Sequence, residues 1–324
     1  MESRNRPAIF LLILCLLIPV GGCGKKTVAA WDDDIHIDMI VKDSRYDYWK
    51  VVKMGAEAAG KEFGVAVRFS GPTDEKNIEQ QIEMVQEAID LKTDAIVLAA
   101  GDYIELAGIA EKAILGGIPV VIIDSELKSD LVKSFIATDN VSAGKKLGEA
   151  LAEKVGNTCS IAIMGFVKGT APCVQREEGL HESLKNYPKI NVLTKEYCNS
   201  NEDTAEKLTE QIVEKYPDID AIVCLNAYGT VGTARAIEKL DLAGKVKIIG
   251  FDSTPEEISF MEKDVIQSLV VQNPFSMGYL GVKYAVDAIN NADIPQRVDT
   301  GSTVIDKNNM YLPENQKLVF PFTD

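Results

Sequence analysis

The residues of this sequence that could do chemistry are polar side chains that follow short apolar runs. They are Asp43, Asp102, Asp124, Asp139, Asn140, Asn226, Asp252 and Gln272, together with Arg176 on the helix expected after one such run. Carboxylates and amides are planar acceptors and donors, and a guanidinium is a bidentate donor. This set suits a polyhydroxylated ligand, whose hydroxyl groups both donate and accept. Tyr46, Tyr48 and Trp49 could present flat faces to its C–H groups.

Each of these residues also has a purely structural interpretation. An aspartate after a strand often caps the next helix. Trp49 could belong to the core face of an amphipathic helix, and Arg176 could form solvated ion pairs with Glu177 and Glu178. The binding hypothesis therefore depends on the whole set meeting at one edge.

The elements that would position this set alternate between apolar strands and amphipathic helices. Residues 95–100 and 118–123 are continuous apolar runs, which are typical of parallel strands buried on both faces. Between residues 75 and 91, apolar residues recur every three or four positions, as on one face of a helix. The scheme runs twice along the chain. We therefore expect an α/β protein with two doubly wound parallel-sheet lobes.

Ligands of open parallel sheets bind beyond the carboxyl ends of the strands, where the polar set would gather. The segment Thr138-Asp139-Asn140 lies between the two repeats, so we expect the chain to cross between the lobes there. We expect Asp139 and Asn140 to cap the helix that begins near Val141.

The N-terminus has the pattern of an exported lipoprotein. Arg4 and Arg6 precede an apolar run at 8–20, and two glycines precede Cys23. This order is typical of a secretory signal peptide, and the run is short for a membrane span. We expect a signal peptide at 1–22, lipid on Cys23 and a tether at 23–34. The alternative is an uncleaved anchor, and either way the protein would be extracytoplasmic and held at the cell membrane.

Charge and cysteines narrow the possibilities further. A net charge of −15 argues against nucleic acid as a partner, because phosphate binding needs a basic face. Four cysteines remain beyond the N-terminal segment: Cys159, Cys173, Cys198 and Cys224. We expect free thiols, with a Cys173–Cys198 disulfide as the alternative.

The sequence shows no catalytic pattern. His36 and His181 are far apart and have no motif around them, and G-x-S-x-G, H-E-x-x-H and G-x-G-x-x-G are absent. We expect no enzymatic activity, no cofactor and no metal.

Several short motifs, in order, resemble the ribose-type periplasmic sugar-binding proteins, the substrate-binding components of bacterial sugar ABC importers. The motifs are Tyr48-Trp49 with Gly55-Ala56, Ile136-Ala-Thr-Asp-Asn-Val141, Gly169-Thr170, Arg176-Glu-Glu-Gly179, Leu225-Asn226, Gly250-Phe-Asp-Ser-Thr-Pro255 and Val270-Val-Gln-Asn-Pro274. The resemblance covers the chain from about residue 35 to the end.

The resemblance implies a type I periplasmic binding protein-like fold with a hinge of three crossovers, near 138–141, 271–274 and 297–301. It implies an N-terminal lobe at 35–138 plus 273–298 and a C-terminal lobe at 139–272 plus 299–324, which close on the ligand. The ligand-binding positions that it implies are Tyr48, Trp49, Asp124, Thr138, Arg176, Asn226, Asp252 and Gln272. Lys42, Asp43 and Asp102 are further candidates.

The chain also departs from the family pattern. Ser125 replaces an arginine, Ala99 stands where an asparagine ends a strand, and an aromatic that stacks on ribose is replaced near Ser200. Lys42 and Arg45 add cations near the cleft, and Asp43-Ser-Arg45 with Trp49 is closer to the xylose-binding relatives. These departures argue against ribose and favour another small, sugar-like ligand.

Two functions fit these expectations. The first is a monomeric solute-binding protein that delivers a monosaccharide or small polyol to an ABC permease. The second is a ligand-loaded partner of a membrane histidine kinase or chemoreceptor. The difference lies on outer surfaces that the sequence does not distinguish.

Overall fold

The computed structural model describes residues 35–322, which contain two six-stranded sheets. In spatial order the first sheet consists of β11 (Arg297–Asp299), β5 (Ser134–Ala137), β4 (Val120–Ile123), β3 (Ala95–Leu98), β1 (His36–Ile40) and β2 (Ala66–Ser70). The second consists of β12 (Ser302–Ile305), β10 (Ser268–Gln272), β9 (Lys247–Phe251), β8 (Ala221–Cys224), β6 (Thr158–Gly165) and β7 (Lys189–Tyr197). Neighbouring strands are parallel except β10 and β12. The predicted α/β fold with two parallel sheets is confirmed.

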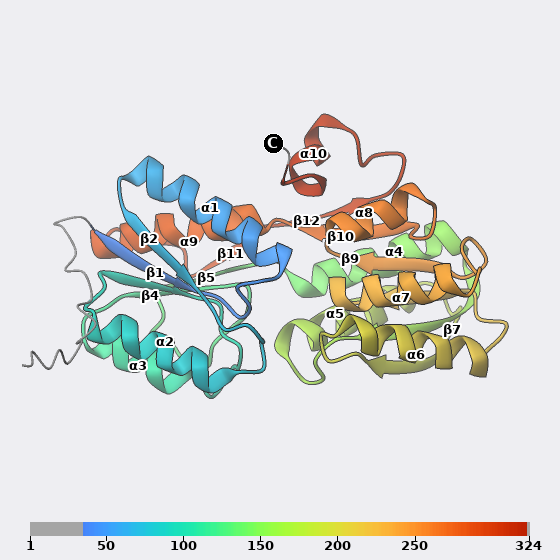
Figure 1. The fold of residues 1–324 in the computed structure, drawn as a ribbon, viewed down its shortest axis with the longest axis horizontal. Coiled ribbons are helices and arrows are strands. Elements are labelled where there is room, and N and C mark those ends of the chain that lie inside the picture. The colour runs from blue at the N-terminus through green and yellow to red at the C-terminus, as the bar shows by residue number, and fades with distance from the viewer. Residues whose placement is uncertain (1–34, 323–324) are drawn as a thin grey trace, which may run out of the picture. The chain divides into compact units, whose positions relative to one another are not determined.

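Helices cover both faces of each sheet (Figure 1). The first sheet has α1 (Asp47–Phe63) and α9 (Pro274–Ile289) on one face, and α2 (Ile78–Asp90) and α3 (Ala107–Leu115) on the other. The second sheet has α4 (Asn140–Val155) and α5 (Ala171–Leu184) on one face, and α6 (Glu202–Lys215), α7 (Ala227–Lys239), α8 (Pro255–Glu262) and α10 (Pro313–Val319) on the other. We call each sheet with its helices the first lobe and the second lobe.

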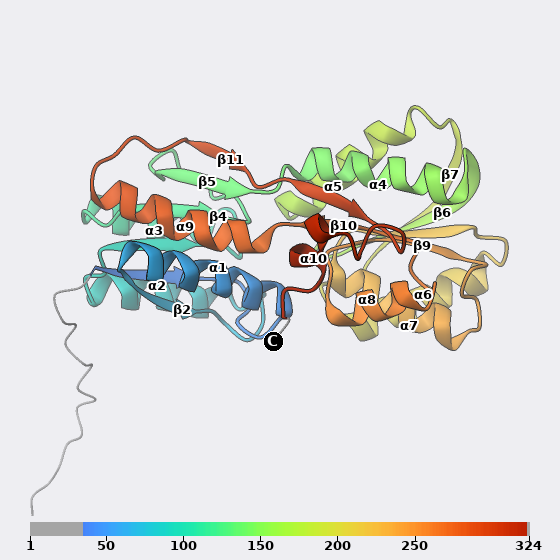
Figure 2. The same ribbon diagram turned by 90° about the horizontal axis from the view of Figure 1, so that it is seen from above.

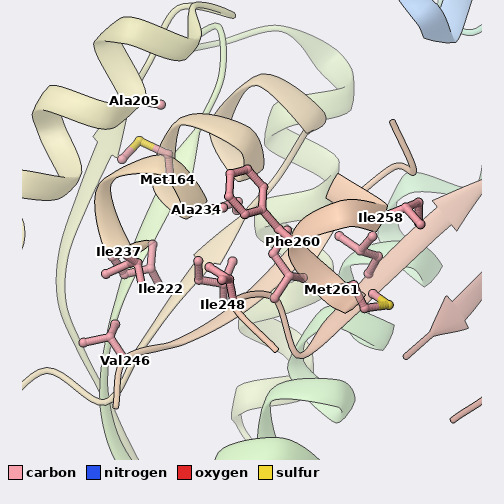
Figure 3. Packing of buried hydrophobic residues seen from close by; sticks show 14 of the residues in the cluster. Met164, Ala205, Ile222, Ala234, Ile237, Val246, Ile248, Ile258, Phe260 and Met261 are labelled. Carbon is pink, nitrogen blue, oxygen red and sulfur yellow. The ribbon is translucent and has the colours of Figure 1, made fainter. Parts of the chain in front are cut away.

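Alternate residues of a central strand pack into opposite layers of the core. In β8, Val223 packs with α4 and α5, whereas Ile222 packs with α7 and α8. Figure 3 shows the second layer, where Ile222 and Ile248 of the sheet lie beneath Ile237, Phe260 and other apolar side chains. Full burial of one such side chain contributes about 1.5–3 kcal/mol. This two-faced burial explains the continuous apolar strands of the sequence.

The same alternation separates two of the cysteines. Cys173 packs in the layer of α4 and α5, and Cys198 packs in the layer of α6 and α7. The second sheet therefore lies between them, and the alternative Cys173–Cys198 disulfide is not formed. Cys159, Cys173, Cys198 and Cys224 are buried free thiols.

The chain crosses between the two lobes three times (Figure 2). It passes from β5 to α4, from β10 back to α9, and from β11 to β12. Only Thr300 and Gly301 separate β11 from β12, and Gly301 has a left-handed φ of 76°. The residues at which one moving lobe ends and the other begins remain a prediction, because a single conformation does not define them.

Some elements differ from the sequence expectations. The strand β11 and the helices α8 and α10 were not predicted, because each is short. The signal for α8 was nevertheless present, since Thr254 and Glu257 form a capping box around Pro255. The helix expected from residue 75 begins at Ile78 instead, because the Asn77 side chain accepts a hydrogen bond from the Gln80 backbone and caps it. Glu75 consequently lies in a loop.

Candidate binding site between the two lobes

A cavity of about 510 Å³, partly open to solvent, lies between the carboxyl ends of the two sheets. From the first lobe it is lined by Lys42, Tyr46, Tyr48, Trp49, Glu75 and Asp124. From the second lobe it is lined by Phe166, Pro172, Arg176, Ser200, Asn226, Ala227, Tyr228, Asp252 and Gln272. Two sets of strand ends, far apart in the sequence, thus share one space.

Asp124 is the centre of the first-lobe wall. It follows β4 with a left-handed φ of 61°. Its Oδ1 accepts a 2.9 Å hydrogen bond from the Tyr48 hydroxyl, while its Oδ2 accepts one of 2.7 Å from Ser125 and lies 2.8 Å from Lys42 Nζ. Burial alone would raise the pKa of Asp124, but the Lys42 ammonium and the donated hydrogen bonds outweigh it, so this pKa is lowered. Asp124 is therefore an ionised acceptor.

The aromatic residues of the first lobe lie beside this carboxylate. The rings of Tyr48 and Trp49 meet edge to face, with centroids 5.0 Å apart. Trp49 is 6% exposed and belongs to the core between α1 and the sheet, so it both lines the cavity and supports its wall. Burial raises the pKa of Tyr48 well above its usual value, so the phenol remains a neutral donor.

Arg176 is the cation of the second-lobe wall and is 4% exposed. Its guanidinium lies 3.7 Å from the centroid of the Phe251 ring and donates from Nη1 to the Leu225 carbonyl at 2.7 Å. Its Nε donates to Asn140 Oδ1 at 2.9 Å. The stack and these two hydrogen bonds hold the side chain in one orientation.

The expected capping role of Asn140 is wrong. Asp139 alone caps α4, because its Oδ1 accepts the hydrogen bond from the Ser142 backbone. Asn140 is the first residue of the helix and is 5% exposed. Its side chain turns inward to the guanidinium of Arg176. Asn140 therefore positions the side chain of Arg176, a role that the sequence did not predict.

Three further polar side chains complete the second-lobe wall. Gln272 donates to Asp252 Oδ1 at 2.7 Å, and the Ala227 backbone donates to Asp252 Oδ2 at 3.2 Å. Burial raises the pKa of Asp252, and the nearby Arg176 opposes this. Asn226 caps α7 through its Oδ1, which accepts from the Gly229 backbone. Its amide nitrogen makes no hydrogen bond to any residue from 35 to 322 and can donate to a ligand.

Three expected site residues do not line this cavity. Thr138 is buried, and its hydroxyl has no hydrogen-bond partner among the described residues. Asp43 accepts a hydrogen bond from the Arg45 backbone within its own turn. Asp102 accepts from the Ile104 and Glu105 backbones and lines a neighbouring cavity of about 1030 Å³.

One aromatic pair joins the two lobes at the edge of the cavity. The rings of Tyr46, before α1, and Tyr228, in the first turn of α7, stack with centroids 4.0 Å apart and an interplanar angle of 20°. The Tyr46 hydroxyl is buried and has no hydrogen-bond partner in residues 35–322.

The sequence from 37 to 293 matches the model of the periplasmic binding protein domain. The chain belongs to this family. Similar proteins include the D-allose-binding periplasmic protein of Escherichia coli, 26% identical over 77% of this chain and 83% of the relative. The ribose import binding protein of Bacillus subtilis is 24% identical over 90% of this chain and 93% of its own length.

Solved structures of sugar-binding proteins have the same fold as this periplasmic binding protein. An ABC transporter solute-binding protein from Agrobacterium vitis with bound D-fucose is 33% identical, with a TM-score of 0.83, over 88% of this chain and 100% of the other. A sugar transporter protein from Clostridium phytofermentans is 36% identical, with a TM-score of 0.76, over 84% and 99%.

Several lining residues of this periplasmic binding protein were not expected from the sequence. Glu75, Phe166, Pro172, Ala227 and Tyr228 also face the cavity. Phe166 comes directly after β6, so a search for residues at the carboxyl ends of the predicted strands would have found it.

Within residues 35–322 no group of acidic, histidine or cysteine side chains could hold a metal ion. In the same part of the chain no helix is long and apolar enough to cross a membrane.

Proposed function

We propose that this periplasmic binding protein captures a monosaccharide or small polyol between its lobes and delivers it to an ABC importer. The observation that carries the proposal is the composition of the cavity. The first lobe supplies three aromatic rings and an ionised carboxylate, and the second lobe supplies an arginine, an asparagine, an aspartate and a glutamine. A sugar ring has apolar C–H faces for the rings and hydroxyls for the polar groups.

The names of the relatives support the same assignment. Relatives named for ribose and D-allose, and a similar structure that contains D-fucose, bind small neutral sugars. The proposed contacts in this chain are Tyr48, Trp49, Asp124, Arg176, Asn226, Asp252 and Gln272, with Lys42 as an added cation. Thr138, Asp43 and Asp102 are weaker candidates because they do not line the cavity.

The proposed action is closure followed by release, without chemical conversion of the ligand. The bodies that would move are residues 35–138 plus 273–298 and residues 139–272 plus 299–324, and the three crossovers would be the hinge. Burial raises the pKa of Cys173 to about 12, so this thiol near the cavity is a poor nucleophile. We propose no enzymatic activity and no cofactor.

The proposed location is the outer side of the cell membrane, with the monomeric protein attached through lipid on Cys23. Cys23, the signal peptide at 1–22 and the tether at 23–34 lie outside the described residues. The proposal is supported by the order of basic, apolar and small residues before Cys23 in the sequence. Such an anchor would keep the protein close to its permease.

A thermal-shift screen tests the proposed function. The full-length protein, in detergent, is heated with pentoses, hexoses, polyols and furanose sugars. A ligand at a hundredfold excess over its Kd should stabilise the fold by about 2.7 kcal/mol. Asp252→Ala and Arg176→Ala should abolish the shift while the proteins remain folded. A full panel without a shift would overturn the function, and unchanged binding in both variants would overturn the site.

A further inference from the structure

Glu75 is a carboxylate of the site that has no polar partner among the described residues. It lies in the loop between β2 and α2 and lines both the 510 Å³ cavity and the neighbouring 1030 Å³ cavity. Its side chain makes no hydrogen bond or ion pair with any residue from 35 to 322. Tyr228 of the second lobe lines the same 510 Å³ cavity, and the charge of Glu75 helps to raise the pKa of that tyrosine.

The other charges of the cavity are balanced. Lys42 Nζ lies 2.8 Å from Asp124 Oδ2. Arg176 is attracted to Asp252, which also accepts a hydrogen bond from Gln272. Two cations thus offset two carboxylates, and Glu75 is the third carboxylate that lines the same space. An uncompensated carboxylate accepts hydrogen bonds and repels anions.

The opposite wall provides a second group without a partner. Ser200 follows Asn199, and both have left-handed backbones, with φ of 49° and 53°. The Ser200 hydroxyl is buried and has no hydrogen-bond partner among the described residues. A serine hydroxyl both donates and accepts hydrogen bonds, so this group can pair with a hydroxyl of a ligand.

We propose that Glu75 and Ser200 form a subsite that receives a hydroxyl group of the ligand, and that Glu75 thereby selects neutral sugars over acidic ones. The sugar hydroxyl donates to the Glu75 carboxylate and exchanges a hydrogen bond with Ser200. A uronate that placed its carboxylate beside Glu75 would be repelled by a charge that forms no ion pair within residues 35–322. This inference rests on the proposed function, since it names the ligand class of the same site.

Calorimetric titration of the full-length protein in detergent tests this subsite. The probes are D-glucose and D-galactose, each with its own uronate, D-glucuronate and D-galacturonate. We expect the wild type to bind the best neutral sugar at least tenfold more tightly than its uronate. In Glu75→Gln the ratio should fall at least tenfold, because the uronate gains affinity. The matched control Glu79→Gln removes the same charge from an exposed position four residues away, outside both cavities, and should keep the wild-type ratio.

The outcomes separate this inference from the function on which it rests. A ratio in Glu75→Gln within twofold of the wild type, or a wild type that prefers a uronate, overturns the subsite while sugar binding stands. A wild type that binds none of the four probes also overturns the subsite. The proposed function fails only when the wider thermal-shift screen finds no ligand either.

Discussion

Asn140 Oδ1 accepts a 2.9 Å hydrogen bond from Arg176 Nε, and this contact ties the first residue after the crossover to the cation of the binding site. The crossover strand β5 ends at Ala137, only three residues earlier. A movement of the chain at this crossover would therefore displace the guanidinium of Arg176.

Replacing Asn140 with alanine should weaken ligand binding. A hydrogen bond to a charged group contributes about 1.5–3 kcal/mol, so we expect a roughly tenfold to hundredfold higher Kd by calorimetry. The control is Asn315→Ala, which removes another buried asparagine hydrogen bond, to the Asn309 carbonyl in a segment that does not line the cavity. Equal affinity loss in both variants would show a general loss of stability instead.

Lys42→Met should make ligand binding depend on pH. In the wild type the Lys42 ammonium is the main group that lowers the pKa of Asp124 against the effect of burial. Without it burial dominates, the pKa rises, and the neutral form of Asp124 accumulates as the pH falls. We expect Kd to rise at least fivefold between pH 7 and 5 in the variant and to stay nearly constant in the wild type.

The control for this profile is Lys50→Met, which removes the exposed ion pair with Asp47 outside the cavity. It should behave like the wild type. A flat profile in Lys42→Met would mean that the hydrogen bonds from Tyr48 and Ser125 suffice to keep Asp124 ionised.

Glu257 should make the fold less stable as the pH rises. It is fully buried, and its Oε1 has no hydrogen-bond partner in the described residues. Burial and the nearby Asp252 raise its pKa well above the usual 4.5. The stabilisation that comes from the neutral form is fully present below pH 4.5 and is lost as the pH rises through the folded-state pKa. Urea unfolding from pH 5 to 8 should show this loss.

Glu257→Gln should remove most of that pH dependence, because an amide does not ionise. Its free energy of unfolding should exceed that of the wild type by an amount that grows with pH. Glu149→Gln, at an exposed position on α4, should leave the pH profile unchanged. Parallel profiles for the wild type and Glu257→Gln would show that other groups carry the dependence.

Cys23→Ser should abolish lipid attachment. Cells that express the full-length protein and are fed an alkyne-tagged fatty acid should label the wild type and leave the variant unlabelled. The Cys159→Ser variant, which lacks a buried thiol far from the N-terminus, should still be labelled. Label on Cys23→Ser would contradict the proposed anchor.

The fold could be predicted from the sequence because strands that are buried on both faces of a sheet consist of consecutive apolar residues. Residues 95–98 are all apolar because alternate side chains of β3 enter opposite core layers. The ends of the predicted strands then gave Asp124 and Asp252, the helix after one such strand gave Arg176, and all three line one cavity. These inferences need only the spacing of apolar residues and the direction of each strand, and both can be read from short segments of the sequence.

The remaining site features depend on side-chain direction, which periodicity does not record. Asn140 occupies a capping position, but its side chain turns to Arg176. The spacing of apolar residues placed Glu75 in the first turn of a helix. In the structure Asn77 caps that helix, so Glu75 lies in the loop before it. Thr138 lies on the crossover itself, yet its hydroxyl does not face the cavity. Cys173 and Cys198 follow adjacent strands but pack in opposite layers.

The stacked rings of Tyr46 and Tyr228 have a consequence for the protein without ligand. Such a pair contributes about 0.5–1.5 kcal/mol beyond the area it buries, which multiplies an equilibrium constant roughly two- to tenfold. Because both rings belong to the chain, the stack stabilises the conformation in which the two lobes are in contact. The apparent Kd is the intrinsic Kd divided by the fraction of binding-competent molecules. If sugar enters only the open form, the stack weakens uptake, and the importer must distinguish empty closed molecules from loaded ones.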